Sequence, residues 1–155
     1  MNDIKLSTVF QNLSEAISED SGISAFMAEK YGEGSEVDIY IGIDLENLPE
    51  STEKAAVYII PGSRSRTRGD SYRQHNITII SFVHSTDKNE DDSITTIEAL
   101  ELLDDFTNLV EKCVYNRMRE MRLAVTPLSG DSDSVFYPIA RSELAYSIEI
   151  PSRIF

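Results

Sequence analysis

Apolar positions in the first third of the chain follow two different periods. One set recurs at the three- and four-residue spacing of an amphipathic helix: Leu6, Val9, Phe10, Leu13, Ala16 and Ile17. A second short helical segment, SAFMAEKYG, follows and ends at Gly32. Apolar and polar residues then alternate in VDIYIGIDL (37–45), which predicts a half-buried strand.

The middle of the chain predicts two strands and one long helix. The apolar run AAVYII (55–60) is a short strand that ends at Pro61. The next strand, NITIISFVHS (76–85), carries Ile80 and Phe82 on the face opposite Ile77 and Ile79, so we expect it to be central and covered on both faces. An apolar stripe then predicts a helix over residues 93–121, about 40 Å long.

Three further strands and a turn complete the predicted fold. The strands are RLAVTPL (122–128), VFYPIA (135–140) and ELAYSIEIP (143–151), with a turn at 129–134. The order of elements predicts a single α+β domain over residues 1–155. We expect a mostly antiparallel sheet, with the N-terminal helix and the long helix packed across one face.

The charge of the chain restricts its partners. With 14 Lys and Arg against 27 Asp and Glu, the net charge of −13 argues against general affinity for nucleic acids or anionic membranes. It also makes copies repel one another unless local patches are complementary. The longest wholly apolar run is too short to span a bilayer and the N-terminus does not resemble a secretion signal, so we expect a soluble cytoplasmic product.

One segment departs from this acidic background. PGSRSRTRGDSYRQH (61–75) has a net charge of +3, whereas the rest of the chain carries −16. Its arginines are Arg64, Arg66, Arg68 and Arg73. Two interpretations stay open: a mobile, solvated loop, or an extended β-arm whose guanidinium groups bind carboxylates of a neighbouring copy or another acidic partner.

The segment DKNEDDSITTIE (87–98) partly matches a calcium-binding loop. The matching ligand positions are Asp87, Asn89, Asp91 and Glu98. Asp92 stands where the sharp turn needs glycine, and a strand precedes the segment where an EF-hand has a helix. We favour the simpler interpretation, a solvated turn at a helix start with a capping box from Thr95 to Glu98.

Catalytic signals are weak. The only histidines, His75 and His84, have an odd spacing that places them on opposite faces of a strand. The sequence contains neither a nucleophile elbow nor a phosphate-binding loop, and the single cysteine, Cys113, lies on the apolar stripe of the long helix. We therefore predict no enzyme activity, no catalytic residues, no cofactor and no metal, and rank an enzyme with an acidic site last.

The order of these elements resembles the tail-completion, or tail-terminator, proteins of long-tailed bacteriophages. LSTVFQNLSEAI, SGISAFMAEKYG and VDIYIGIDLENLPES are similar to the start of that family. AAVYIIPGS, a β-arm, HNITIISFVHS, a long helix and terminal strands are similar to its later part. The resemblance spans nearly the whole chain. It lies in element order and hydrophobic rhythm, which related neck proteins share, and not in a diagnostic motif.

The resemblance implies a structural protein of the virion, assembled in the host cytoplasm. Such subunits form a hexameric ring that caps the tail tube and joins it to the head–neck connector, while DNA passes through without specific binding. The expected partners are other copies, the tail tube protein and the connector. The arginine arm would contact neighbours or the tube, and a neighbour would cover Ile80 and Phe82. The alternatives are another neck or head-closure ring protein, or a calcium-binding module.

Overall fold

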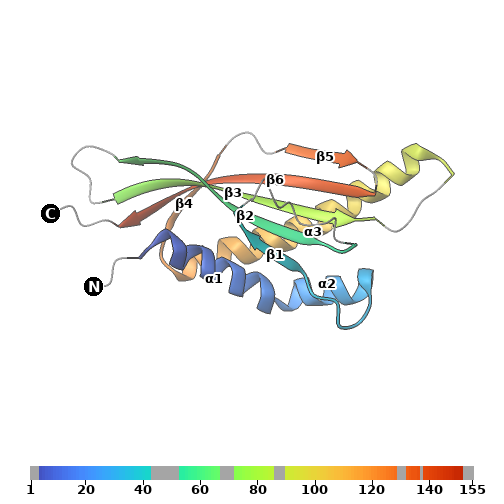
Figure 1. The fold of residues 1–155 in the computed structure, drawn as a ribbon, viewed down its shortest axis with the longest axis horizontal. Helices are drawn as coiled ribbons and strands as arrows, with labels where there is room; N and C mark the ends of the chain where they lie inside the picture. Colours follow the sequence, from blue (N-terminus) through green and yellow to red (C-terminus); the bar gives the residue numbers. More distant parts are fainter. Residues whose placement is uncertain are drawn as a thin grey trace.

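The computed structural model describes residues 4–42, 53–66, 72–85, 90–128, 132–136 and 138–151. Within these residues, six strands form one sheet, and three helices lie against one of its faces (Figure 1). All strand pairs are antiparallel except one. The predicted α+β class is therefore confirmed.

Two of the three helices begin at aspartate caps. Helix α1 (Leu6–Glu19) is followed by α2 (Ser21–Tyr31), where the Asp20 carboxylate accepts the Ile23 N–H at 2.9 Å. The long helix α3 (Asp92–Glu120) begins after Asp91, whose carboxylate accepts the Ser93 N–H at 2.9 Å. None of these helices is both long and apolar enough to cross a membrane.

The capping box predicted from Thr95 to Glu98 is wrong. Helix α3 already begins at Asp92, so Thr95 lies inside its first turns. There the Thr95 hydroxyl donates to the carbonyl of Asp91, four residues earlier, at 3.3 Å. The run of Asp, Ser and Thr residues offered several possible caps, and the structure places the helix start at the earlier one.

The strand order is β1–β2–β3–β6–β4, with β5 also paired to β6. The strands are β1 (Asp38–Ile41), β2 (Ala56–Arg66), β3 (Tyr72–His84), β4 (Ala124–Pro127), β5 (Ser132–Phe136) and β6 (Ile139–Pro151). Strand β1 pairs in parallel with β2 and is described only to Ile41, so part of the predicted strand 37–45 lies outside the described residues. Strand β3 lies between β2 and β6, as the sequence predicts.

Several boundaries differ from the sequence-based expectation. Strand β3 begins at Tyr72, before the predicted residue 76, and the predicted strand 135–140 is divided between β5 and β6. Strand β2 does not end at Pro61 but continues through a bulge to Arg66, paired with β3. Among the described residues, the pairing of β1 with β2 reaches only Ile59, so no described strand needs a donor from Pro61 on that side. Strand β5 begins at Ser132, inside the predicted turn, because it pairs back onto β6.

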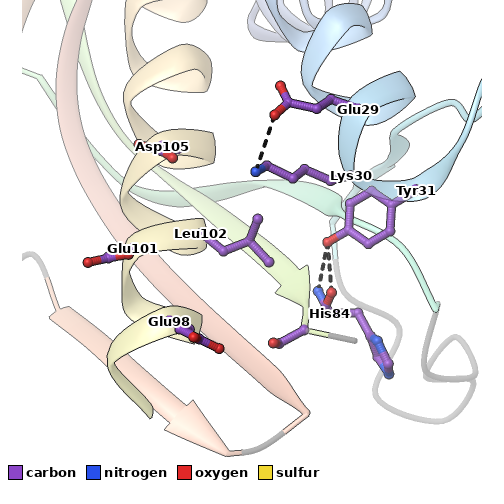
Figure 2. A pocket seen from close by; sticks show the side chains of 9 residues that line it. Glu29, Lys30, Tyr31, His84, Glu98, Glu101, Leu102 and Asp105 are labelled. Atoms are coloured by element: carbon purple, nitrogen blue, oxygen red, sulfur yellow. Dashed lines mark hydrogen bonds and ion pairs between the residues drawn. The ribbon is translucent and has the colours of Figure 1, made fainter. Parts of the chain in front are cut away.

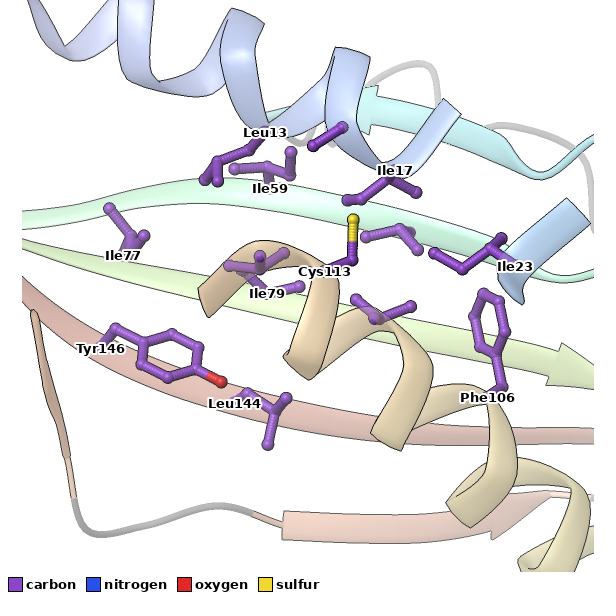
Figure 3. Close-up of a cluster of buried hydrophobic side chains, with 14 of the residues drawn as sticks. Leu13, Ile17, Ile23, Ile59, Ile77, Ile79, Phe106, Cys113, Leu144 and Tyr146 are labelled. Atoms are coloured by element: carbon purple, nitrogen blue, oxygen red, sulfur yellow. The ribbon is translucent and has the colours of Figure 1, made fainter. Parts of the chain in front are cut away.

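The core lies between the helices and one face of the sheet. Alternate residues of β3 and β6, including Ile77, Ile79 and Tyr146, point toward α3 and are buried there (Figure 3). Phe106 of α3 is fully buried, and Cys113, two turns further along the same helix, is buried as predicted. The described elements leave the opposite face of β3 without a covering helix, so the expectation of cover on both faces is wrong for the part of the chain that the structure describes.

Candidate interaction surfaces

The described arginines of the basic segment lie on the hairpin formed by β2 and β3. Arg64 is in register with His75, and the backbone of Arg66 pairs with that of Arg73. Because register partners share a face and alternate residues point the same way, Arg64, Arg73 and His75 lie on the side of the sheet that carries the helices. We call these three residues the basic hairpin face. Arg68 lies outside the described residues.

The basic hairpin face has uncompensated charge. Burial lowers the pKa of His75, and the neighbouring guanidinium groups of Arg64 and Arg73 lower it further. Among the described residues, neither arginine forms an ion pair, and the buried Nε of Arg73 has no hydrogen-bond partner. The exposed guanidinium group of Arg64 is therefore available to an external acceptor.

Polar side chains on the other face hold the hairpin in register. Asn76 donates to the Ser63 hydroxyl at 2.8 Å, and Ser65 donates to Gln74 at 3.3 Å. The Gln74 amide in turn donates to Ser147 of β6 at 2.6 Å, which ties the hairpin to the third strand. Residues 61–66 and 72–75 are thus paired strand, and the mobile-loop interpretation is wrong for them.

A row of aromatic side chains crosses the uncovered sheet face. Tyr40 of β1 stacks on Tyr58 of β2 with ring centroids 4.9 Å apart, and Phe82 of β3 meets Tyr58 edge-on at 5.2 Å. Ile80 packs beside this row and is buried, whereas Phe82 is half-buried. Burial raises the pKa of Tyr58, with smaller contributions from Tyr40 and Asp38. Half-buried aromatic clusters of this kind are enriched in protein interfaces.

An acidic cavity of about 390 Å³ lies between α2, α3 and the end of β3 (Figure 2). Its charged lining residues are the acids Glu29, Glu98, Glu101 and Asp105 and one base, Lys30, whose Nζ lies 3.5 Å from the Glu29 carboxylate. Tyr31 forms part of the wall: its hydroxyl donates to the His84 carbonyl at 2.9 Å and accepts the His84 N–H at 3.1 Å. Burial raises the pKa of Tyr31, and the two hydrogen bonds to the His84 backbone fix the position of its hydroxyl group.

Sequence reasoning missed the acidic cavity. Three of its acids recur at the i, i+3, i+7 spacing that places residues on one face of α3. Acids are so abundant in this chain that the spacing alone is not informative. The wall from α2 and β3 comes from residues distant in sequence, so no local signal could reveal it.

The predicted interface residues form two patches. Arg64 and Arg73 lie on the helix side of the sheet near one end, whereas Ile80 and Phe82 lie on the uncovered face. These four residues therefore do not form one continuous contact surface for a neighbour. The histidines His75 and His84 occupy opposite faces of β3, as their spacing predicts.

The possible calcium loop falls only partly within the described residues. Asp87 and Asn89 lie outside them, Asp91 caps α3, and Glu98 lines the acidic cavity. In the parts of the chain that the structure describes, no group of three or more His, Cys, Asp or Glu side chains could hold a metal ion. Calcium binding by the complete loop stays a prediction.

Comparison with models of known protein families and with curated proteins found no match.

Proposed function

We propose that this protein is a ring-forming structural subunit of a bacteriophage tail, a tail terminator that caps the tail tube and joins it to the head–neck connector. The observation that carries the proposal is the basic hairpin face, a strand-paired, positively charged projection on a chain that is acidic elsewhere. It supports self-association because the same molecule supplies both signs of charge.

The balance of charge favours assembly through local contacts. The −16 charge outside residues 61–75 opposes nonspecific clustering of copies. Arginine binds carboxylates through forked, charge-assisted hydrogen bonds, which are directional as well as strong. A pre-ordered hairpin loses little conformational entropy when it docks, so such contacts select one arrangement of neighbours.

The same charge suits a passage for DNA. A ring built from acidic subunits repels phosphate, so the duplex slides through without counterion release or sticking. The hexamer, the tail tube and connector partners and the virion location follow from the family resemblance. A neighbouring protomer would cover the aromatic row around Phe82. Another neck or head-closure ring would use the same surfaces, and the genes beside this one would distinguish the two.

The oligomeric state of the full chain tests the proposal. Size-exclusion chromatography with light scattering, alone and with the tail tube protein, should show a closed oligomer of defined mass. Arg64→Glu should reduce it, whereas Lys112→Glu, the matched reversal of an exposed base in the middle of α3, should not. A chain that stays monomeric even with the tube protein present would contradict the proposal.

A further inference from the structure

We infer that the acidic cavity of one copy receives the basic hairpin face of the next, so that copies associate head to tail. This inference rests on the proposed function, because it specifies how the subunits of that ring contact one another. Its occupant is a second copy of this chain, and its chemistry is arginine against carboxylate.

The two surfaces lie at opposite ends of the molecule. The hairpin of β2 and β3 projects at one end of the long axis, and the start of α3, the end of α2 and the end of β3 meet at the other (Figure 1). Arg73 and His84 stand near the two ends of the same strand, β3. At the rise of an extended chain they are about 35 Å apart. One molecule therefore cannot bring its own hairpin to its own cavity, and the contact requires two copies.

Each surface has the charged groups that the other needs. Glu101 and Asp105 are exposed and form no ion pair with any described residue, and Arg64 and Arg73 are unpaired in the same way. The buried Nε of Arg73 is a hydrogen-bond donor without an acceptor, which is unusual in a folded protein. The exposed Arg64 side chain is the one that a neighbour's carboxylates reach directly.

The cavity also suits the aliphatic part of an arginine. Leu102 and the ring of Tyr31 line it together with the carboxylates (Figure 2). Arginine stems pack on apolar and aromatic surfaces while the guanidinium reaches charged partners. Because the Tyr31 hydroxyl is bonded to the backbone of His84, the wall is already ordered before a neighbour arrives.

Contact between opposite ends has a consequence for symmetry. Such a contact is heterologous: each copy uses one surface to bind and leaves the other free for the next copy. Such contacts give a ring where the rotation between neighbours closes and an open filament where it does not, and the proposed function requires the ring. Pairing through the uncovered aromatic face of two copies would instead give a two-fold dimer.

Charge swapping in the full chain tests the inference. The variants are Arg64→Glu/Arg73→Glu on the hairpin, Glu101→Arg/Asp105→Arg in the cavity, and the four substitutions together. Sedimentation velocity should show at least tenfold weaker association for each pair and recovery to near the original affinity for the fourfold variant. Asp105→Arg alone should weaken association more than Asp104→Arg, which reverses an exposed neighbour on α3 outside the cavity.

Weaker association of the Glu101→Arg/Asp105→Arg variant cannot be explained by the change in net charge. It changes the net charge from −13 to −9 and so lowers general repulsion between copies. Repulsion alone therefore predicts stronger association, whereas head-to-tail docking predicts weaker association. Circular dichroism and thermal melting establish that each variant folds.

The outcomes separate this inference from the proposed function. If the original chain forms its ring and the cavity reversal leaves association equal or stronger, the inference is wrong while the ring proposal stands. Failure of the fourfold variant to recover also overturns the inference. If the original chain never associates, with or without the tube protein, the ring proposal fails and the inference fails with it.

Discussion

At the scale of single residues, His75 shows how the hairpin accommodates its charge. The imidazole is only 9% exposed and lies beside two guanidinium groups. Both its burial and its neighbours disfavour the protonated form, so it serves as a neutral polar spacer at neutral pH. A third permanent cation at this position would add repulsion within the hairpin.

This environment makes stability depend on pH. Because the pKa of His75 is lowered by folding, the unfolded chain binds more protons below its own histidine pKa of about 6.5. The contribution of neutral His75 to the free energy of unfolding is therefore complete above pH 6.5. It is lost as the pH falls toward the lower pKa that His75 has in the folded chain. Urea unfolding at several pH values should show this loss, and His75→Gln should reduce it. His84→Gln is the control. If the free energy of unfolding falls with pH as steeply in His75→Gln as in the original chain, the prediction is wrong.

The thiol of Cys113 should react slowly with alkylating reagents in the folded protein. Burial raises the pKa of its thiol to about 11, with a further contribution from Asp20. Since the thiolate is the reactive form, alkylation at neutral pH should be roughly 100-fold slower or more in the native chain than in urea. The chain has no other cysteine, so the labelling rate reports this site alone. Equal rates in both conditions would show that the thiol is accessible.

At the scale of elements, the hairpin depends on close backbone packing at its bulge. The register of β2 shifts between Pro61 and Arg64, and Gly62 lies in this step. A Cβ at Gly62 would stand 2.9 Å from the Asn76 carbonyl oxygen, closer than real contacts allow. Strand β2 reaches Arg66 because glycine fits where a side chain would push the strands apart.

Gly62→Ala should therefore destabilise the hairpin. Overpacking of this kind costs about 1–3 kcal/mol, measurable as a lower free energy of unfolding in urea. Ser63→Ala, which removes only the exposed hydrogen bond to Asn76, should cost less than half as much. If both substitutions have the same small effect, the bulge does not have the close packing described above. Weaker self-association of Gly62→Ala would further link hairpin geometry to assembly.

At the scale of the whole molecule, the separation of charge is the dominant property. The hairpin of β2 and β3, which carries Arg64 and Arg73, lies at one end of the ribbon in Figure 1. The parts of α2, α3 and β3 that line the acidic cavity lie at the other end. A molecule with such a long-range charge separation orients its neighbours before they touch. The same acidic background should exclude nucleic acids from binding.

The chain should therefore have no measurable affinity for duplex DNA near physiological salt. An electrophoretic mobility assay at about 150 mM salt should show no shift at micromolar protein, because few cations face a strongly negative background. The Arg64→Glu variant should behave identically. A shift that persists at this salt and disappears in Arg64→Glu would identify the hairpin as a phosphate-binding arm and contradict a passive DNA passage.

Local pattern predicted most of the elements. The periodicity from Leu6 to Ile17 identified α1, and the stripe along residues 93–121 identified α3 within one residue at each end. Boundaries failed where pairing partners decided them: β2 passes Pro61, and β5 begins inside a predicted turn. Both boundaries depend on which strand pairs with the segment, and the sequence of the segment alone does not specify its pairing partner.

Hydrophobic rhythm and charge content are properties of neighbouring residues along the chain. The sequence alone was therefore sufficient for the α+β class, the burial of Cys113 and the concentration of arginines in one segment. Register and packing depend on residues far apart in sequence. Only the tertiary structure could place Arg64 and Phe82 on opposite faces and assemble the acidic cavity from α2, α3 and β3.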